Sequence, residues 1–232
     1  MGARFATSKQ GVLPVTVGGN NADSAGASAS MLSKGRMEAL SDGVLAFAMT
    51  LLVVDLALRP PGSPLHQFLA AWPAYLAYVV SFLTIGSAWI AHTALTDGLE
   101  QVDRIFLRIN LVFLMFVAFL PFPTRLVGSA LHQGTGAERV AATVYGLSLL
   151  AIRLLGFALA AYSRARHLRQ VGVEDADMRE SGRKFRFVVA GYIATIVLGL
   201  FVPTIAIAVY LAIALFLFIP FRAVMAELSG GR

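Results

Sequence analysis

The sequence has no cysteine among its 232 residues and only four histidines. Without cysteine there is no disulfide framework, no thiolate metal site and no thiol nucleophile. His66, His92, His132 and His167 are scattered without the spacing of metal ligands, and none is paired with a convincing nucleophile. The sequence therefore predicts neither an enzyme nor a protein with a bound cofactor.

Charged residues are scarce as well, at 14% of the chain, whereas a water-soluble domain has about 25%. Hydrophobic residues make up 57%, and the mean hydropathy is +0.73. This composition is typical of an integral membrane protein in a lipid bilayer. The formal net charge of +6 would suit nucleic acid, but in a membrane chain a basic excess more often marks the loops that stay in the cytoplasm. No nucleic-acid partner is expected.

A helix needs roughly twenty predominantly apolar residues to cross a bilayer. Six segments meet this requirement, so the expected fold is all-α with six transmembrane helices. Only "VPT" at 202–204 separates the last two, and Pro203 is expected to mark a turn. One long kinked helix is the alternative, although it would overshoot the bilayer. The segments are 37–58, 69–92, 105–123, 139–162, 187–202 and 204–221.

The remaining residues are assigned to tails and connectors. Residues 1–35 are rich in Gly, Ala, Ser and Asn and are predicted to form a flexible tail before the membrane domain at 36–222. Residues 223–232 form a short C-terminal tail. Lys and Arg are concentrated in the connector 163–186, which places both termini in the cytoplasm. This connector also holds Asp and Glu, which favours a solvated helical link over a lipid-binding patch.

The first segment carries an apolar stripe on one face of the predicted helix. At 100° per residue its members fall within a narrow angle. Such a stripe ordinarily packs against the protein's own core. Thr50 lies beside it, and small residues such as Gly43 and Ala46 allow neighbouring helices to approach closely. The stripe consists of Leu40, Phe47, Leu51, Val54 and Leu58.

Polar residues stand at both ends of the same segment. Arg36, Ser41 and Asp42 lie at its start. A carboxylate at the edge of the hydrocarbon needs a partner, either Arg36 or a polar group of another helix. Alternatively, Arg36 reaches the head groups, Ser41 bonds to its own helix and Asp42 interacts with the positive helix N-terminus. Asp55, near the opposite surface, either attracts cations to a pore mouth or is a solvated helix end.

Other predicted helices also contain polar residues. Trp89 and His92 of the second helix lie level with Asp42, which offers His92 a carboxylate at matching depth, while Trp89 suits an interfacial anchor. Arg153 lies well inside the fourth helix without an acidic neighbour on that helix. Its partner must be a carbonyl, a carboxylate or water.

The stretch "RMEALSDGVLAFAMTLLVVDL" resembles the first-helix signature of the transmembrane protein 175 family of potassium channels. In that signature an Arg, three variable residues and Phe-Ser-Asp open the helix. Arg36, Ser41 and Asp42 match, whereas Leu40 replaces the Phe.

Two later segments resemble the same family. The stretch "SFLTIGSAWIAHT" at 81–93 is similar to the second helix through Trp89 and His92, although Thr93 takes the place of a second histidine. The stretch "RINLVFLMFVAFLPFPTRL" at 108–126 is similar to the third helix. The resemblance thus covers three ordered motifs.

The resemblance implies a homotetramer in a bacterial plasma membrane, with the first helix of each subunit lining a central pore and no re-entrant filter loop. The permeant ion would be potassium, and Thr50 would form a hydroxyl ring favouring it over sodium. Phe47, where the family usually has Ile or Leu, would form hydrophobic constrictions together with Leu51 and Val54. The residues implied to hold the cytoplasmic helix ends together are Arg36, Ser41, Asp42, Trp89 and His92.

A passive, potassium-preferring channel is therefore the leading hypothesis, and the family alone suggests proton permeability. A secondary transporter would show repeated halves and broken helices at mid-membrane, and neither is evident in this sequence. Ser41 beside Asp42 lacks a third catalytic member, which argues against a membrane enzyme. A scaffold without transport is a further alternative.

Overall fold

The structure is a computed structural model, and it describes residues 34–54, 63, 65, 66, 69, 71–130, 135–168 and 178–219. Most of the two predicted tails, together with Asp55 and Leu58, lies outside the described residues. The helices are α2 (Lys34–Val54), α4 (Trp72–Asp97), α5 (Arg104–Phe119), α6 (Pro121–Ala130), α7 (Thr135–Ala165), α8 (Met178–Phe201) and α9 (Pro203–Phe218).

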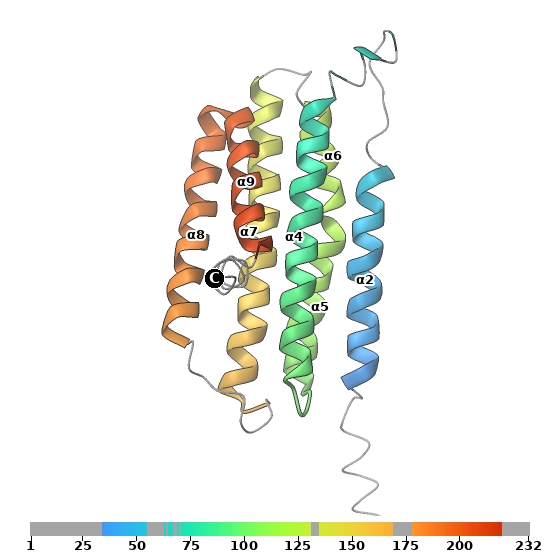
Figure 1. Ribbon diagram of the computed structural model, residues 1–232, viewed down its shortest axis with the longest axis vertical. Coiled ribbons are helices and arrows are strands. Elements are labelled where there is room, and N and C mark those ends of the chain that lie inside the picture. The colour runs from blue at the N-terminus through green and yellow to red at the C-terminus, as the bar shows by residue number, and fades with distance from the viewer. Residues whose placement is uncertain are drawn as a thin grey trace, which may run out of the picture. The chain divides into compact units, whose positions relative to one another are not determined.

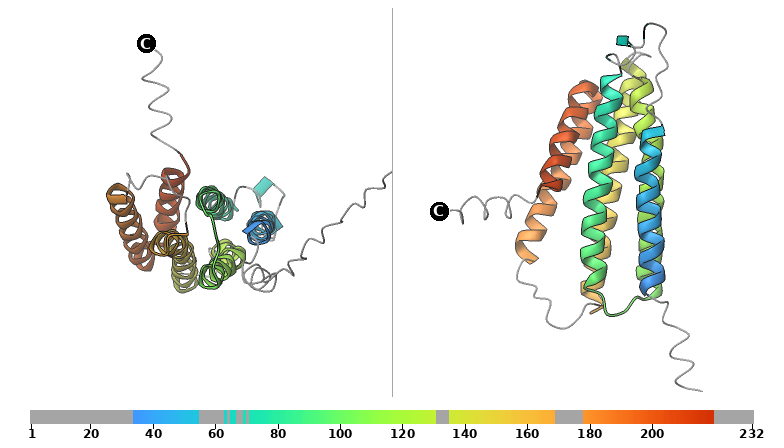
Figure 2. Two further views of the ribbon diagram at one scale, coloured as in Figure 1. Left: turned by 90° about the horizontal axis from the view of Figure 1, so that it is seen from below. Right: turned by 45° about the vertical axis from the view of Figure 1, so that its right-hand side comes forward.

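These helices lie side by side in one bundle, with α4 and α7 in the middle (Figure 1). At one edge α2 packs against α4, α5 and α6. At the opposite edge α8 packs against α7 and α9, and α9 also packs against α4. Figure 2 shows α2 at the rim of the bundle from two further directions.

The expectation of an all-α membrane protein is confirmed in the part of the chain that the structure describes. Five helical segments are long and apolar enough to cross a membrane, namely α2, α4, α5 together with α6, α7 and α8. The sixth, α9, is apolar but has only 16 residues, fewer than the roughly twenty that a full span needs. The count of six spans therefore stays a prediction.

The link between the last two helices is a turn, as predicted. Helix α8 ends at Phe201, α9 begins at Pro203, and the two helices pack against each other. Proline has no N–H to donate and is tolerated in the first turn of a new helix. The alternative of one long kinked helix is therefore wrong.

Several predicted helix boundaries are wrong, most of all those of the third and fifth segments. The third segment, predicted at 105–123, is interrupted at Leu120 and continues as α6 to Ala130. The interruption has a local cause, because Pro121 and Pro123 lack the N–H groups that would continue the hydrogen bonds of the helix. Helix α8 begins at Met178 rather than at 187, so the basic residues at 183–186 are helical and do not lie in a connector.

Hydroxyl groups and one glycine join the middle helices. Ser81 Oγ of α4 lies 2.7 Å from Thr124 Oγ1 of α6 and 2.9 Å from the Tyr145 hydroxyl of α7. The Tyr145 and Tyr210 rings meet edge to face, with centroids 5.7 Å apart. A β-carbon at Gly146 would collide with the Tyr210 hydroxyl, so only glycine lets α9 approach α7 this closely.

Candidate functional site

One face of α2 is buried by the subunit and the other is not. The buried positions recur every three or four residues, as expected for one side of a helix. They are Met37, Ser41, Leu45, Ala48 and Leu52. The exposed positions follow the same period on the opposite side and are mostly small or apolar. Among them are Arg36, Leu40, Gly43, Phe47, Thr50 and Val54.

The structure places most of the predicted pore-lining residues on this exposed face. The Phe47 side chain is 64% exposed and that of Val54 is 68% exposed. Leu51 is half-buried, so it lies at the border of the face. For Asp55 and Leu58, outside the described range, the predicted roles stay predictions.

Thr50 is the polar residue between Phe47 and Val54 on this face. Its hydroxyl donates to the Phe47 carbonyl of its own helix, with 2.7 Å between the oxygens. A hydroxyl carries one proton and two acceptor lone pairs. Because the proton is used within the helix, the exposed oxygen presents acceptor lone pairs, which suit a cation.

A buried polar chain fixes the opposite face of α2 to the bundle. Ser41 Oγ donates to the Met37 carbonyl at 2.9 Å and accepts a hydrogen bond from Asn110 Nδ2 of α5, also at 2.9 Å. Asn110 Oδ1 accepts from His92 Nε2 of α4 at 2.9 Å. The His92 ring stacks on Phe113, with centroids 5.7 Å apart. Three helices are thus joined through one amide.

Asp42 has a partner on α4. Trp89 Nε1 donates to Asp42 Oδ1 at 2.9 Å, and Trp89 is itself partly exposed. Of the two partners that the sequence offered Asp42, the polar group of another helix is confirmed, because Trp89 rather than Arg36 bonds the carboxylate. The expected pairing of Asp42 with His92 is wrong, because His92 bonds Asn110. Arg36 lies exposed on the uncovered face.

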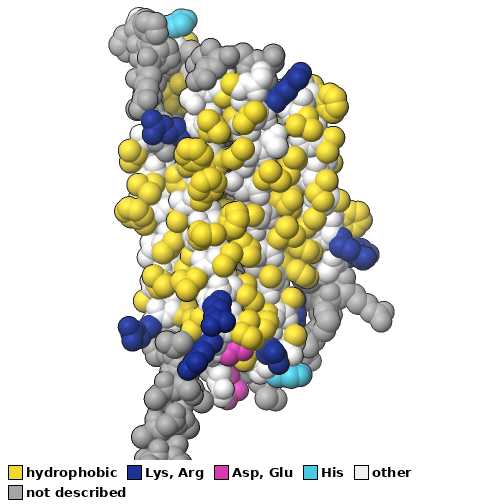
Figure 3. Space-filling model, turned by 180° about the vertical axis from the view of Figure 1, so that it is seen from behind, with side chains coloured by type: hydrophobic (Ala, Val, Ile, Leu, Met, Phe, Trp, Pro, Cys, Tyr) yellow, Lys and Arg dark blue, Asp and Glu magenta, His cyan; other side chains and the backbone are white. Residues whose placement is uncertain are grey.

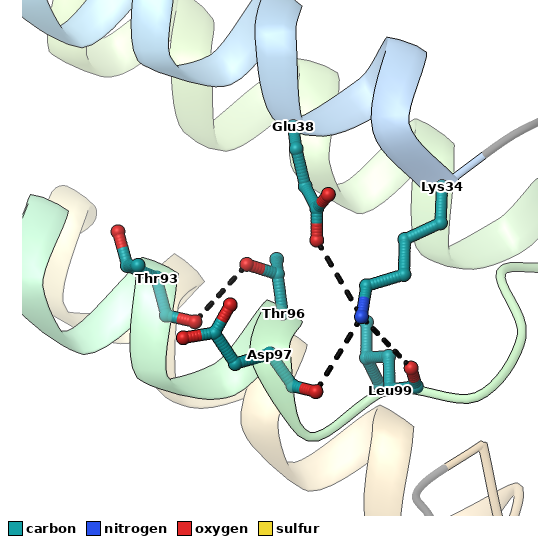
Figure 4. Close-up of polar contacts among 6 residues, drawn as sticks. All are labelled: Lys34, Glu38, Thr93, Thr96, Asp97 and Leu99. Atoms are coloured by element: carbon teal, nitrogen blue, oxygen red, sulfur yellow. Dashed lines mark hydrogen bonds and ion pairs between the residues drawn. The ribbon is translucent and has the colours of Figure 1, made fainter.

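A lysine joins the first turn of α2 to the end of α4 (Figure 4). Lys34 Nζ donates to the carbonyls of Leu99 at 3.0 Å and Asp97 at 3.4 Å, and lies 3.6 Å from a Glu38 carboxylate oxygen. Carbonyls at a helix C-terminus lack helical partners and carry partial negative charge. The ammonium group therefore stabilises the end of α4 while it holds α2 in place.

Asp103 closes the same end of the bundle. Its Oδ1 caps α5 by accepting from the Phe106 N–H at 2.7 Å, and its Oδ2 accepts from the Tyr162 hydroxyl of α7 at 2.7 Å. Partial burial raises the pKa of this carboxyl, but these hydrogen bonds outweigh it and hold the pKa below its usual value. Asp103 is thus an ionised link between α5 and α7.

Charge is distributed unevenly along the bundle. In the view from behind, hydrophobic side chains cover the middle of the surface, while basic and acidic side chains gather mainly toward the lower end (Figure 3). This is the end where α2 begins and α4 finishes. Within the described residues no group of three His, Asp or Glu side chains that could hold a metal ion occurs.

Sequence reasoning missed several residues of this site, among them Asn110 and Lys34. Asn110 was noticed only within a motif, although it is a lone amide in an otherwise apolar run, and buried amides need partners. Lys34 was assigned to the tail before the first predicted helix. Its position at the start of a helix gave no signal that it would cap another helix.

Comparison with known proteins identifies relatives that match most of the chain. The family model described as the endosomal/lysosomal potassium channel TMEM175 matches residues 36–121. A protein of Streptomyces collinus named a potassium channel is 37% identical over 190 residues, covering 80% of this chain and 92% of that protein. The human protein named the endosomal/lysosomal proton channel TMEM175 is 38% identical over 101 residues, 39% of this chain and 20% of its own length.

A solved structure shares the fold. The crystal structure of a lysosomal potassium-selective channel TMEM175 homologue from Chamaesiphon minutus superposes with a TM-score of 0.68 at 30% sequence identity. The match covers 79% of this chain and 95% of that one. The bundle therefore has the fold of that homologue.

Proposed function

The chain belongs to the TMEM175 family, and we propose that it forms a potassium-preferring channel in which four copies of α2 surround one pore. The observation that carries this proposal is the uncovered stripe of α2 at the rim of the bundle, with Phe47, Thr50 and Val54 exposed. The bacterial relatives are named potassium channels. In this proposal the stripe is uncovered because its partners are the same stripe in three other subunits.

In the proposed pore the rings of Phe47 and Val54 form hydrophobic constrictions. Such rings gate by expelling water, which removes the hydration shell that an ion needs. Leu51 borders these constrictions, and Leu58 extends the lining. Thr50 lies between the rings, and its outward lone pairs offer a dehydrated potassium ion an oxygen ligand. Asp55 is proposed to attract cations at the outer mouth.

The polar motif residues have a structural role in this proposal. Ser41 and Asp42 tie α2 to α5 and α4, and His92 extends the tie through Asn110. These bonds set the rotation of α2 about its own axis and so aim the opposite face at the pore. Arg36 is proposed to join the same assembly at the cytoplasmic end.

The proposed topology has six spans, with both tails in the cytoplasm of a bacterial plasma membrane. It is supported by Lys and Arg, which gather toward the end of the bundle where α2 starts. Positive residues flank the cytoplasmic ends of membrane helices. Residues 36–222 then form the channel domain, and the tails lie on one side.

A proton channel is the second candidate function. The animal relatives that match α2 and its neighbours are named proton channels. Protons can cross a narrow hydrated gap that excludes larger ions. A potassium channel and a proton channel therefore differ in which gradient the protein dissipates.

Flux in liposomes tests the proposal. We expect purified full-length protein to dissipate a potassium gradient without a coupling ion, and faster than an equal sodium gradient. A pH-sensitive dye in the same vesicles measures proton flux. Flux that saturates and requires a second ion would indicate a transporter instead. Absence of any flux would contradict both candidates.

A crosslink tests the position of α2, because the natural sequence has no cysteine. We expect Val54→Cys to form disulfide-linked dimers under oxidation, since the proposed pore brings four copies of this position together. Val197→Cys, exposed on α8 at the opposite edge, is the matched control and should stay monomeric. Equal crosslinking of both variants would place α2 away from a shared axis.

A further inference from the structure

A cavity of about 250 Å³ lies between α4, α5, α7, α8 and α9. No residue of α2 lines it, so it is separate from the proposed pore. The lining is apolar apart from His92, Arg153 and Lys184, and none of the lining residues in the described part of the chain is acidic. The cavity therefore combines an apolar interior with positively charged side chains.

Arg153 is the half-buried cation of this cavity. Its Nη2 donates to Ser87 Oγ, whose own proton goes to the Thr84 carbonyl at 3.0 Å. Its Nε is buried and has no hydrogen-bond partner among the described residues. A guanidinium carries a positive charge, and a charge that is partly withdrawn from water is stabilised by an opposite charge beside it. The site is therefore suited to an anion.

Arg153 lies in the half of the bundle where α4 and α7 end. Its partner Ser87 stands two residues before Trp89, or about 3 Å along α4 by helical rise. Trp89 bonds the Asp42 carboxylate, and tryptophan is enriched at the level of the lipid head groups. Lys184, exposed in the basic first turns of α8, also lines the cavity. An anionic lipid that enters from this half of the bundle would meet both cations in the cavity.

The rest of the cavity suits a hydrocarbon chain. Phe157 of α7 and Phe185 of α8 stack with ring centroids 3.8 Å apart and form part of its wall. Leu159 and Leu217 contribute further apolar surface. The volume lies just below that of pockets for small molecules, about 300 Å³ or more. It therefore admits part of one acyl chain and not a whole lipid.

We propose that this cavity binds an anionic phospholipid of the cytoplasmic leaflet. The phosphate pairs with Arg153 and Lys184, and one acyl chain inserts between α7, α8 and α9. Basic pockets between membrane helices on the cytoplasmic side are suited to such head groups, because that leaflet is rich in anionic lipid. The sequence favoured a solvated connector around Lys184, whereas the cavity assigns this residue to a lipid.

Lipid titration of the purified full-length protein tests this site. Binding is measured by native mass spectrometry and by the melting temperature, with phosphatidylglycerol, with phosphatidylcholine of the same chains, and with inorganic phosphate. We expect only phosphatidylglycerol to bind tightly and to raise the melting temperature. We expect Arg153→Gln to weaken this binding roughly tenfold or more, because a hydrogen-bonded charge pair is lost. Arg139→Gln, exposed on the same helix outside the cavity, should bind as the natural protein does.

A second variant tests the part of the site that holds the acyl chain. It also tests lipid binding if Arg153→Gln does not fold. At Gly156, which lines the cavity, an added β-carbon would have Phe113 as its nearest neighbour, at 4.0 Å. Gly156→Leu should therefore fill the cavity, keep Arg153 and abolish tight phosphatidylglycerol binding. Equal binding to all variants, equal binding of phosphatidylcholine, or an inorganic phosphate effect matching that of the lipid would overturn the proposal. None of these readouts depends on ion flux, so the proposed channel function is tested separately.

Discussion

The two faces of α2 are similar in composition but differ in what covers them. Toward the bundle, Leu45 and Leu52 are at most 1% exposed, whereas on the other side Phe47 and Val54 are 64% and 68% exposed. Both faces are apolar, so apolarity alone does not decide which face the subunit buries. We infer that the polar residues decide it.

The polar contacts of α2 lie on its covered side and at the edge of that side. Ser41 is buried and hydrogen-bonded to Asn110, and Asp42 is bonded to Trp89. In hydrocarbon an unpaired polar group costs roughly several kcal/mol of free energy. A rotation of α2 would break these bonds without improving the apolar contacts. The polar groups therefore select one of two apolar faces for the core and leave the other for a further partner.

The largest expected effect is a loss of stability on substitution of a residue in the covered face of α2. Leu45→Ala removes a fully buried side chain, and we expect it to lower the free energy of unfolding by about 2–5 kcal/mol, since a cavity remains. Val54→Ala on the exposed face is the matched control and should change it by less than about 0.5 kcal/mol. The measurement is unfolding in mixed detergent micelles. Similar losses for both variants would show that the two faces are equally packed within one subunit.

The next largest effect is expected when Asn110 is replaced, because its hydrogen bonds anchor the covered face of α2. Asn110→Leu leaves Ser41 and His92 without their shared partner, and an unsatisfied buried polar group costs about 1–3 kcal/mol. We expect a loss of this size in the same unfolding measurement. Val112→Ala, an exposed position on the same helix, serves as the control. An unchanged midpoint for Asn110→Leu would mean that the polar chain does not hold α2.

The sequence predicted the helices of this bundle well, because hydrophobic length and proline positions are local signals. The turn at Pro203 was evident from three residues. The break at Leu120 was missed although Pro121 and Pro123 follow it, because the apolar run continues without interruption and was read as one span. Length signals thus place spans better than they place kinks.

The site was predicted less completely than the fold. Periodicity assigned Phe47 and Val54 to one face, but it describes each helix about its own axis only. The pairs His92 with Asn110 and Arg153 with Ser87 depend on which faces of two helices meet, and no spacing along one helix contains that information. Asp42 was expected to find a partner at matching depth, and depth alone did not distinguish His92 from Trp89.

The third prediction concerns the uncovered face. Phe47→Ala should increase potassium flux in liposomes about threefold to tenfold, because a smaller ring expels water less completely from the proposed constriction. This change corresponds to at most about 1.4 kcal/mol in the barrier. The stability of the subunit should stay nearly unchanged, since the Phe47 side chain is exposed. Unchanged flux in the mutant vesicles would argue that Phe47 faces lipid and that the two faces differ only in packing.

The smallest effect is expected where α2 meets the end of α4. Lys34→Gln removes a cation from the carbonyls of Asp97 and Leu99, and a charge at a helix C-terminus is worth about 0.3–1 kcal/mol. Glu38→Gln removes only the i,i+4 ion pair, so its loss should be smaller still, about 0.3–0.5 kcal/mol. Amide hydrogen exchange in the last turn of α4 measures both, and the Lys34→Gln difference should shrink in high salt because exposed charges are screened. Faster exchange in Glu38→Gln than in Lys34→Gln would assign the contact to the carboxylate, and the end of α4 would then not depend on α2.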